Sequence, residues 1–60
     1  MMGAFLASHL TPGQAITVYD NGTVISTGVY ISSADQYLVW VPTGGTRQVL
    51  HLGDGISVTF

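Results

Sequence analysis

Apolar and polar residues alternate along most of this chain, and such alternation predicts short β-strands. In the stretch Ala15–Ser32, two β-prone runs flank Asn21-Gly22. Asn-Gly between such runs favours a type I′ hairpin turn, because that turn needs a positive φ at both central residues. Gly28 lies inside the second run. A glycine there predicts a bend, a bulge or a close approach of another backbone segment.

The residues before this hairpin follow a different period. Phe5, Leu6, His9 and Leu10 recur at helical spacing, and Pro12 disfavours any continuation of the helix. After the hairpin, three more β-prone runs are separated by short turn-forming segments. The pattern predicts a helix over residues 2–10 and strands over residues 15–20, 23–32, 36–41, 46–52 and 56–60.

These elements occupy one domain, residues 1–60. The fold class is all-β, with a short N-terminal helix followed by five strands with short connections. In so short a chain, five such strands predict a small, strongly bent antiparallel barrel of the SH3-like kind, in which Gly28 allows the sheet to curl. A five-stranded OB-type barrel is the alternative, although it usually needs more residues.

The composition adds an expectation of self-association. Hydrophobic residues make up 47% of the chain and charged residues 7%, whereas soluble domains average about 25% charged residues. A 60-residue domain buries only about 60% of the surface that its unfolded chain exposes, so part of this apolar surface remains outside. Apolar surface of that extent marks contact with another protein, and a homo-oligomer is the first expectation.

Charge and cysteine content exclude other classes. There is no cysteine, which excludes disulfides and thiolate metal sites. The net charge is −2 and Arg47 is the single Lys or Arg residue, which argues against tight nucleic-acid binding. No run approaches the roughly 18–20 apolar residues of a spanning helix, and Met1–Leu10 lacks the basic start of a signal peptide. We therefore expect no membrane contact and a cytoplasmic location, in a bacterial or phage-infected cell.

Short motifs along the chain resemble the Sm-like family, which includes the Hfq proteins. Phe5-Leu6 is similar to a Phe-Leu pair in the Hfq helix, and Asn21-Gly22 resembles the first hairpin turn. Gly28 is similar to the mid-strand glycine of the first Sm motif, and Asp35-Gln36-Tyr37 to the Asp-Gln-Phe before the third strand. Gly53-Asp54-Gly55-Ile56 resembles the tight turn of the second Sm motif.

This resemblance implies a ring of five to eight identical subunits, joined by pairing of the fourth strand of one subunit with the fifth strand of the next. The interface residues that it implies are Val49, Leu50, Leu52, Ile56, Val58 and Phe60. It also implies single-stranded RNA as a ligand, with Asp35, Tyr37, Arg47 and His51 as candidate contacts. The chain nevertheless departs from the family in lacking the basic Tyr-Lys-His segment of the Hfq RNA site.

Each RNA-site candidate also has a structural interpretation. His51 is equally a strand histidine bonded to a neighbour, and Asp35 suits an Asx-type turn. Aromatic residues such as Tyr37 stack on bases, but they are also enriched in cores and subunit interfaces. Arg47 suits either a phosphate or an ion pair with Asp54 of a neighbouring subunit.

No arrangement of residues indicates catalysis. A cysteine nucleophile, a phosphate-binding glycine loop and a metal-spaced cluster are all missing from the sequence. We therefore expect no enzymatic activity, no cofactor and no metal. Two functions remain: a ring-forming structural or protein-interaction module of Sm-like type, or a weak single-stranded RNA binder of Hfq-like type.

Overall fold

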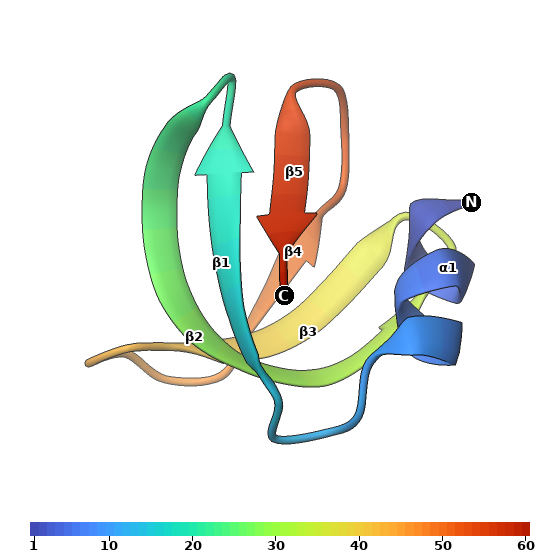
Figure 1. The fold of residues 1–60 in the computed structure, drawn as a ribbon, viewed down its shortest axis with the longest axis horizontal. Coiled ribbons are helices and arrows are strands. Elements are labelled where there is room, and N and C mark those ends of the chain that lie inside the picture. Colours follow the sequence, from blue (N-terminus) through green and yellow to red (C-terminus); the bar gives the residue numbers. More distant parts are fainter.

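The computed structural model describes residues 1–60 and contains one helix followed by five antiparallel strands (Figure 1). The strands form one sheet in the order β4-β3-β2-β1-β5. The short N-terminal helix and the five-stranded antiparallel sheet predicted from the sequence are thus confirmed. The elements are α1 (Met2–His9), β1 (Ala15–Asp20), β2 (Thr23–Ala34), β3 (Tyr37–Pro42), β4 (Gln48–His51) and β5 (Ile56–Thr59).

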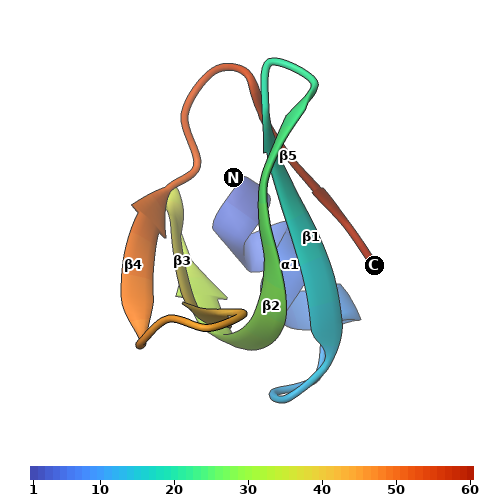
Figure 2. The ribbon, with the colours of Figure 1, turned by 90° about the vertical axis from the view of Figure 1, so that its left-hand side faces the viewer.

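The sheet is strongly curved about β2, its longest and central strand. Figure 2 shows β3 and β4 on one side of the molecule and β1 and β5 on the other, with β2 between them. The pairing register shifts between Val18 and Tyr19 on β1, and again between Tyr30 and Ser32 on β2. Such irregularities increase the local bend and twist of a strand.

Gly28 is the position at which β2 and β3 approach most closely. A Cβ atom there would overlap the carbonyl oxygen of Val41 and would lie 2.9 Å from the Cα of Pro42. It would also lie 3.0 Å from Cε3 of Trp40. The mid-strand glycine therefore marks a close backbone approach, one of the meanings predicted from the sequence.

The Asn21-Gly22 turn has the backbone that the sequence predicts. Both residues have a positive φ, 50° at Asn21 and 82° at Gly22, as a type I′ turn requires. The turn also makes a tertiary contact, because the amide of Asn21 donates to the carbonyl of Gly55, 2.8 Å away. This bond ties the β1–β2 hairpin to the turn before β5.

Four of the five strands differ in their bounds from the sequence pattern. The third strand lies one residue further along, at Tyr37–Pro42 instead of residues 36–41, and the fifth ends at Thr59 instead of residue 60. The helix ends at His9 instead of residue 10. The pattern ends the second strand at residue 32, but β2 continues to Ala34 because Ser33 and Ala34 pair with Leu38 and Tyr37. The fourth strand is shorter than predicted and covers Gln48–His51 instead of residues 46–52.

Helix α1 is anchored at its start to the β2–β3 turn. The amide of Gly3 donates to the carbonyl of Asp35 at 2.8 Å, and Ser33 Oγ donates to the carbonyl of Gly3 at 2.7 Å. The amide of Met2 donates to Oε1 of Gln36 at 3.2 Å. The bonds from the amides of Met2 and Gly3 use backbone N–H groups that the first helical turn leaves unpaired.

The core lies inside the curve of the sheet, with the helix covering one opening. Its eight buried hydrophobic residues are Leu6, Leu10, Ile16, Val18, Tyr30, Leu38, Trp40 and Leu52. No pairing joins β4 to β5, so the sheet is open between these two strands. The single helix is too short to cross a membrane.

We expect the substitution Gly28→Ala to lower the free energy of unfolding by about 1–3 kcal/mol, the usual cost of forcing extra atoms into a tightly packed site. Gly45→Ala is the matched control, because the nearest atom to a Cβ at Gly45 is 3.5 Å away. Denaturant unfolding of both variants measures the difference. Equal stabilities for the two variants would contradict the close approach at Gly28.

Candidate functional site

The two edge strands, β4 and β5, are the most distinctive surface feature of this fold. Each contains four residues, and each is paired on one side only, β4 with β3 and β5 with β1. The backbone N–H and C=O groups on the outer side of an edge strand are available to another strand. The molecule therefore has two short sheet edges on which a partner strand can pair.

The residues predicted for a subunit interface differ in exposure. Val49 is 66% exposed and Phe60 is 60% exposed. Leu50, Ile56 and Val58 are only partly buried and pack against the core. Leu52, by contrast, is 1% exposed and belongs to the core of the single chain. Five of the six residues therefore still have surface available to a partner, whereas Leu52 has essentially none.

Of the residues predicted to contact RNA, two come together. Tyr37 and His51 are directly opposite each other on β3 and β4, with their ring centroids 5.1 Å apart and tilted by 57°. Asp35 lies in the turn just before β3, with a φ of 52°, and is exposed. Arg47 precedes the opposite end of β4 from His51. The structure thus places the one basic residue away from the aromatic pair.

The outward face of α1 carries a second aromatic pair. Helical spacing grouped Phe5 and His9 with Leu6 and Leu10, yet Leu6 and Leu10 are buried and Phe5 is 54% exposed. The rings of Phe5 and His9 stack with their centroids 4.1 Å apart, and His9 Nδ1 lies 2.8 Å from the carbonyl oxygen of Phe5. The signal for this pair was its spacing of four residues, which places two side chains on one helix face.

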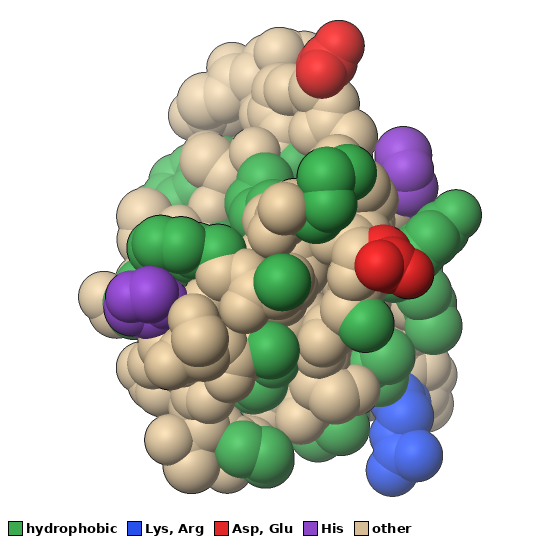
Figure 3. Space-filling model, turned by 90° about the vertical axis from the view of Figure 1, so that its right-hand side faces the viewer, with side chains coloured by type: hydrophobic (Ala, Val, Ile, Leu, Met, Phe, Trp, Pro, Cys, Tyr) green, Lys and Arg blue, Asp and Glu red, His purple; other side chains and the backbone are tan.

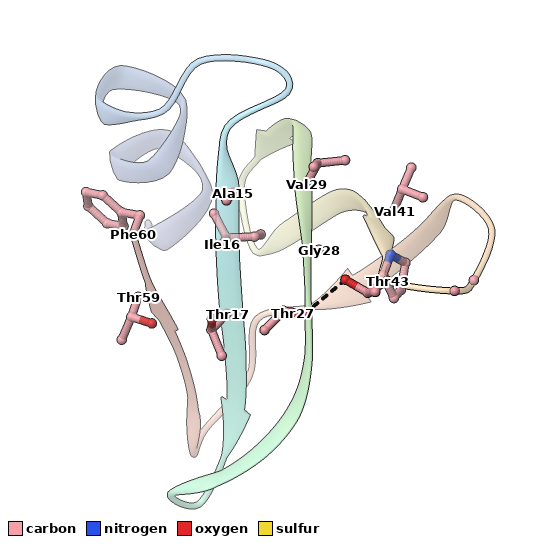
Figure 4. Close-up of a pocket in the computed structure, with 13 residues that line it drawn as sticks. Ala15, Ile16, Thr17, Thr27, Gly28, Val29, Val41, Thr43, Thr59 and Phe60 are labelled. Carbon is pink, nitrogen blue, oxygen red and sulfur yellow. Dashed lines mark hydrogen bonds between the residues drawn. The ribbon is translucent and has the colours of Figure 1, made fainter.

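A shallow groove of about 750 Å³, which the sequence did not predict, lies beside the Gly28 bend. Its walls carry the hydroxyl groups of Thr17, Thr27, Thr43 and Thr59, with Phe60 at one end (Figure 4). Thr27 Oγ1 and Thr43 Oγ1 are 2.9 Å apart and share a hydrogen bond. The side chains that line the groove are threonine, proline and apolar residues.

Charged side chains are few over the whole molecule. Figure 3 views the face that carries α1 and shows hydrophobic side chains spread among backbone and other side-chain atoms, with only isolated charged groups. No three His, Asp or Glu side chains lie close enough together to hold a metal ion. The surface features of this molecule are thus sheet edges, exposed apolar residues and aromatic pairs.

The order of elements, an N-terminal helix followed by five antiparallel strands, is compatible with the Sm-like fold. Comparison of the chain with models of protein families, with curated proteins and with solved structures finds no match. The agreement with the Sm-like fold therefore lies in the topology.

We expect Leu52→Ala and Val49→Ala to differ sharply in their effect on the isolated chain. Leu52 is 1% exposed, and truncation of a buried leucine costs about 2–5 kcal/mol of stability. Val49 is 66% exposed, so its truncation should change stability by no more than about 0.5 kcal/mol. Urea unfolding at a protein concentration that keeps the chain dissociated is the measurement. A loss at Val49 as large as that at Leu52 would refute this division between core and edge.

Proposed function

We propose that this chain is a non-catalytic subunit of Sm-like type that assembles with copies of itself into a closed ring. In this proposal β4 of one subunit pairs with β5 of the next, and the bent sheet is an SH3-like barrel. The observation that carries the proposal is the pair of unpaired sheet edges, both of which bear residues that pack on the core. The ring size, five to eight subunits, follows from the resemblance to the Sm-like family.

Pairing of the β4 edge of one subunit with the β5 edge of the next would account for both edges being unpaired in the single chain. Each subunit has one β4 edge and one β5 edge, and each edge offers four residues. A contact between two different surfaces repeats head to tail, and it ends only when the subunits close a ring. Pairing of β4 with β4 would give a dimer and would leave β5 unpaired, with the aggregation hazard of an open edge.

Exposed apolar residues support assembly further. Val49 on β4 and Phe60, directly after β5, are among the large hydrophobic residues with more than half of their surface exposed. The charged residues number only four, Asp20, Asp35, Asp54 and Arg47, in a chain that is 47% hydrophobic. Strand pairing that covers these edges would bury apolar surface that the single chain leaves in water. The cytoplasmic location expected from the sequence belongs to the same proposal.

Binding of single-stranded RNA is the second candidate, and the Tyr37–His51 pair favours it. Both rings are exposed and lie side by side, 5.1 Å apart. Aromatic side chains stack on unpaired bases regardless of sequence, and each stacked base contributes about 1–3 kcal/mol. The charge balance opposes this function, because the three aspartates outnumber the single arginine.

We expect Val49→Lys to convert the assembly into monomers. The lysine would place a charge on the β4 edge, where it opposes the approach of a second strand. Sedimentation velocity at micromolar concentration distinguishes the ring from the monomer. Phe5→Lys serves as the control, since Phe5 is also more than half exposed but lies on helix α1 and not on a sheet edge. A wild-type chain that remains monomeric at micromolar concentration would overturn the proposal.

The RNA function predicts a measurable affinity for A-rich or U-rich oligonucleotides that weakens as salt is added. Under that function Tyr37→Ala should weaken binding by about tenfold, as the loss of one stacked base implies. Fluorescence anisotropy with labelled oligonucleotides at several salt concentrations gives the affinity. Absence of binding at micromolar concentration by the assembled protein would exclude this second candidate.

A further inference from the structure

One buried polar atom in this structure has no hydrogen-bond partner: the indole nitrogen Nε1 of Trp40. Trp40 is 1% exposed, so its indole lies away from bulk solvent. A buried donor without an acceptor destabilises a fold, and most buried donors have one. The Trp40 N–H is therefore a buried donor that is left unpaired in the single chain.

The surroundings of Trp40 restrict where an acceptor for this N–H can lie. On β2, the ring carbon Cε3 occupies the space left by the missing side chain of Gly28. Nε1 is on the opposite edge of the indole from Cε3, so the N–H is turned away from Gly28. Tyr30, the partner of Trp40 on β2, uses its hydroxyl in a hydrogen bond of 2.8 Å with Ser33 Oγ. The strand on the other side of Trp40 is β4.

Gln48 is the residue of β4 directly opposite Trp40. Residues opposite each other in an antiparallel pair have Cβ atoms about 4.5–5.5 Å apart and project on the same face, so the amide of Gln48 is within reach of the indole. In the isolated chain Gln48 is exposed and its side chain makes no hydrogen bond. An acceptor and an unpaired donor thus lie on neighbouring strands without being joined.

Gln48 lies on the side of the sheet that faces the core. Leu50 is opposite the fully buried Leu38, so Gln48 and Leu50 share the core face of β4. On β5, Val58 is opposite the fully buried Val18. Because side chains alternate, Phe60 continues the core face beyond Val58. Gln48 is exposed only because no strand lies beyond β4.

A second copy that pairs its β5 with β4 must keep the two core faces together, because a slip of one residue would turn every side chain to the wrong face. Two antiparallel registers satisfy this condition. In one, Leu50 is opposite Val58 and Gln48 is opposite Phe60. In the other, Leu50 is opposite Ile56 and Gln48 is opposite Val58. In both registers an apolar side chain of the second copy covers Gln48.

We propose that Gln48 accepts a hydrogen bond from Trp40 Nε1 when a second copy covers it. The inference rests on the proposed assembly through β4 and β5 and names the pair of side chains whose bond forms on assembly. Once covered, the Gln48 amide loses its water and needs a partner on the core face. The Trp40 N–H supplies that partner, and the bond satisfies a donor that is unpaired in the single chain.

A double-mutant cycle on the full chain tests this assignment. Gln48→Leu removes the acceptor and keeps a side chain of similar size, and Trp40→Phe removes the donor. With Trp40 present, Gln48→Leu should weaken subunit association about fivefold, the factor typical of one hydrogen bond. With Phe at position 40, the same change should leave association unchanged or tighten it, and their difference is the coupling between the two residues. Sedimentation equilibrium gives the association constants.

A second measurement does not depend on the folding of the Trp40→Phe variant. Trp40 is the only tryptophan, so its indole N–H gives one resonance in a ¹⁵N-labelled sample. We expect this resonance to move downfield in the assembled wild type relative to the monomeric Val49→Lys variant, and not to move in assembled Gln48→Leu. Thr23→Val, another polar-to-apolar change at an exposed strand residue, should leave both association and resonance unchanged.

The outcomes separate the two proposals. A wild type that assembles while the indole resonance stays at its monomer position overturns the role of Gln48 and leaves the ring proposal intact. If Gln48→Leu changes the association constant equally with Trp and with Phe at position 40, the role of Gln48 is likewise overturned and the ring proposal stays intact. A wild type that remains monomeric overturns both proposals.

Discussion

The close contact between β2 and β3 at Gly28 is the constraint on which the rest of this fold depends. The carbonyl of Val41 and the ring of Trp40 occupy the space of a side chain there. This contact lets the 12-residue strand β2 curve, so that one sheet can cover both sides of a core. Pairing of β1 with β5 brings the β1–β2 turn to the turn before β5, where the amide of Asn21 donates to the carbonyl of Gly55. With any larger residue at position 28 the sheet would be flatter and the core less enclosed.

The curved sheet encloses the core on two sides and leaves two openings. One opening is covered by a helix, and the other is not covered. Helix α1 covers the first, with Leu6 and Leu10 in the core and Gly3 bonded to the β2–β3 turn. Nothing in the chain covers the second opening, between β4 and β5. There the apolar layer ends in residues that are only partly buried, among them Leu50 and Val58. A chain of 60 residues buries only about 60% of the surface that it exposes when unfolded, which agrees with an apolar layer that ends in partly buried residues.

Sequence reasoning succeeded where the determinant is local. The positive φ at Asn21 and Gly22 follows from the residue types, and so does the end of the helix before Pro12. It failed where a distant partner decides the outcome. Ser33 and Ala34 resemble turn residues, but pairing with β3 holds them in β2. Helical spacing placed Phe5 and Leu6 together, yet only Leu6 meets the sheet.

For the candidate site, too, the sequence indicated the strand in which a residue lies but not the distant residues that it contacts. Position in the fourth strand marked Leu50 and Leu52 alike as interface residues. The bond from the Leu52 amide to the carbonyl of Gln36 lies beyond any such pattern, and Leu52 itself is buried in the core. The pairing of Tyr37 with His51 required the β3–β4 register, which no local signal supplies. The unpaired Trp40 N–H is likewise invisible in the sequence, since it depends on which neighbours lack a free acceptor.

Assembly of several identical subunits would affect RNA binding and strand pairing in opposite ways. A ring multiplies the charges of one chain, and each copy adds three aspartates for one arginine. Repetition therefore deepens the negative charge that opposes phosphate groups, and the Tyr37–His51 pair would have to hold RNA by stacking alone. Strand pairing gains with each added copy, because every new contact covers one β4 edge and one β5 edge. The features that the isolated chain leaves unsatisfied are thus the features that the proposed assembly would use, and this asymmetry favours the ring over the RNA site.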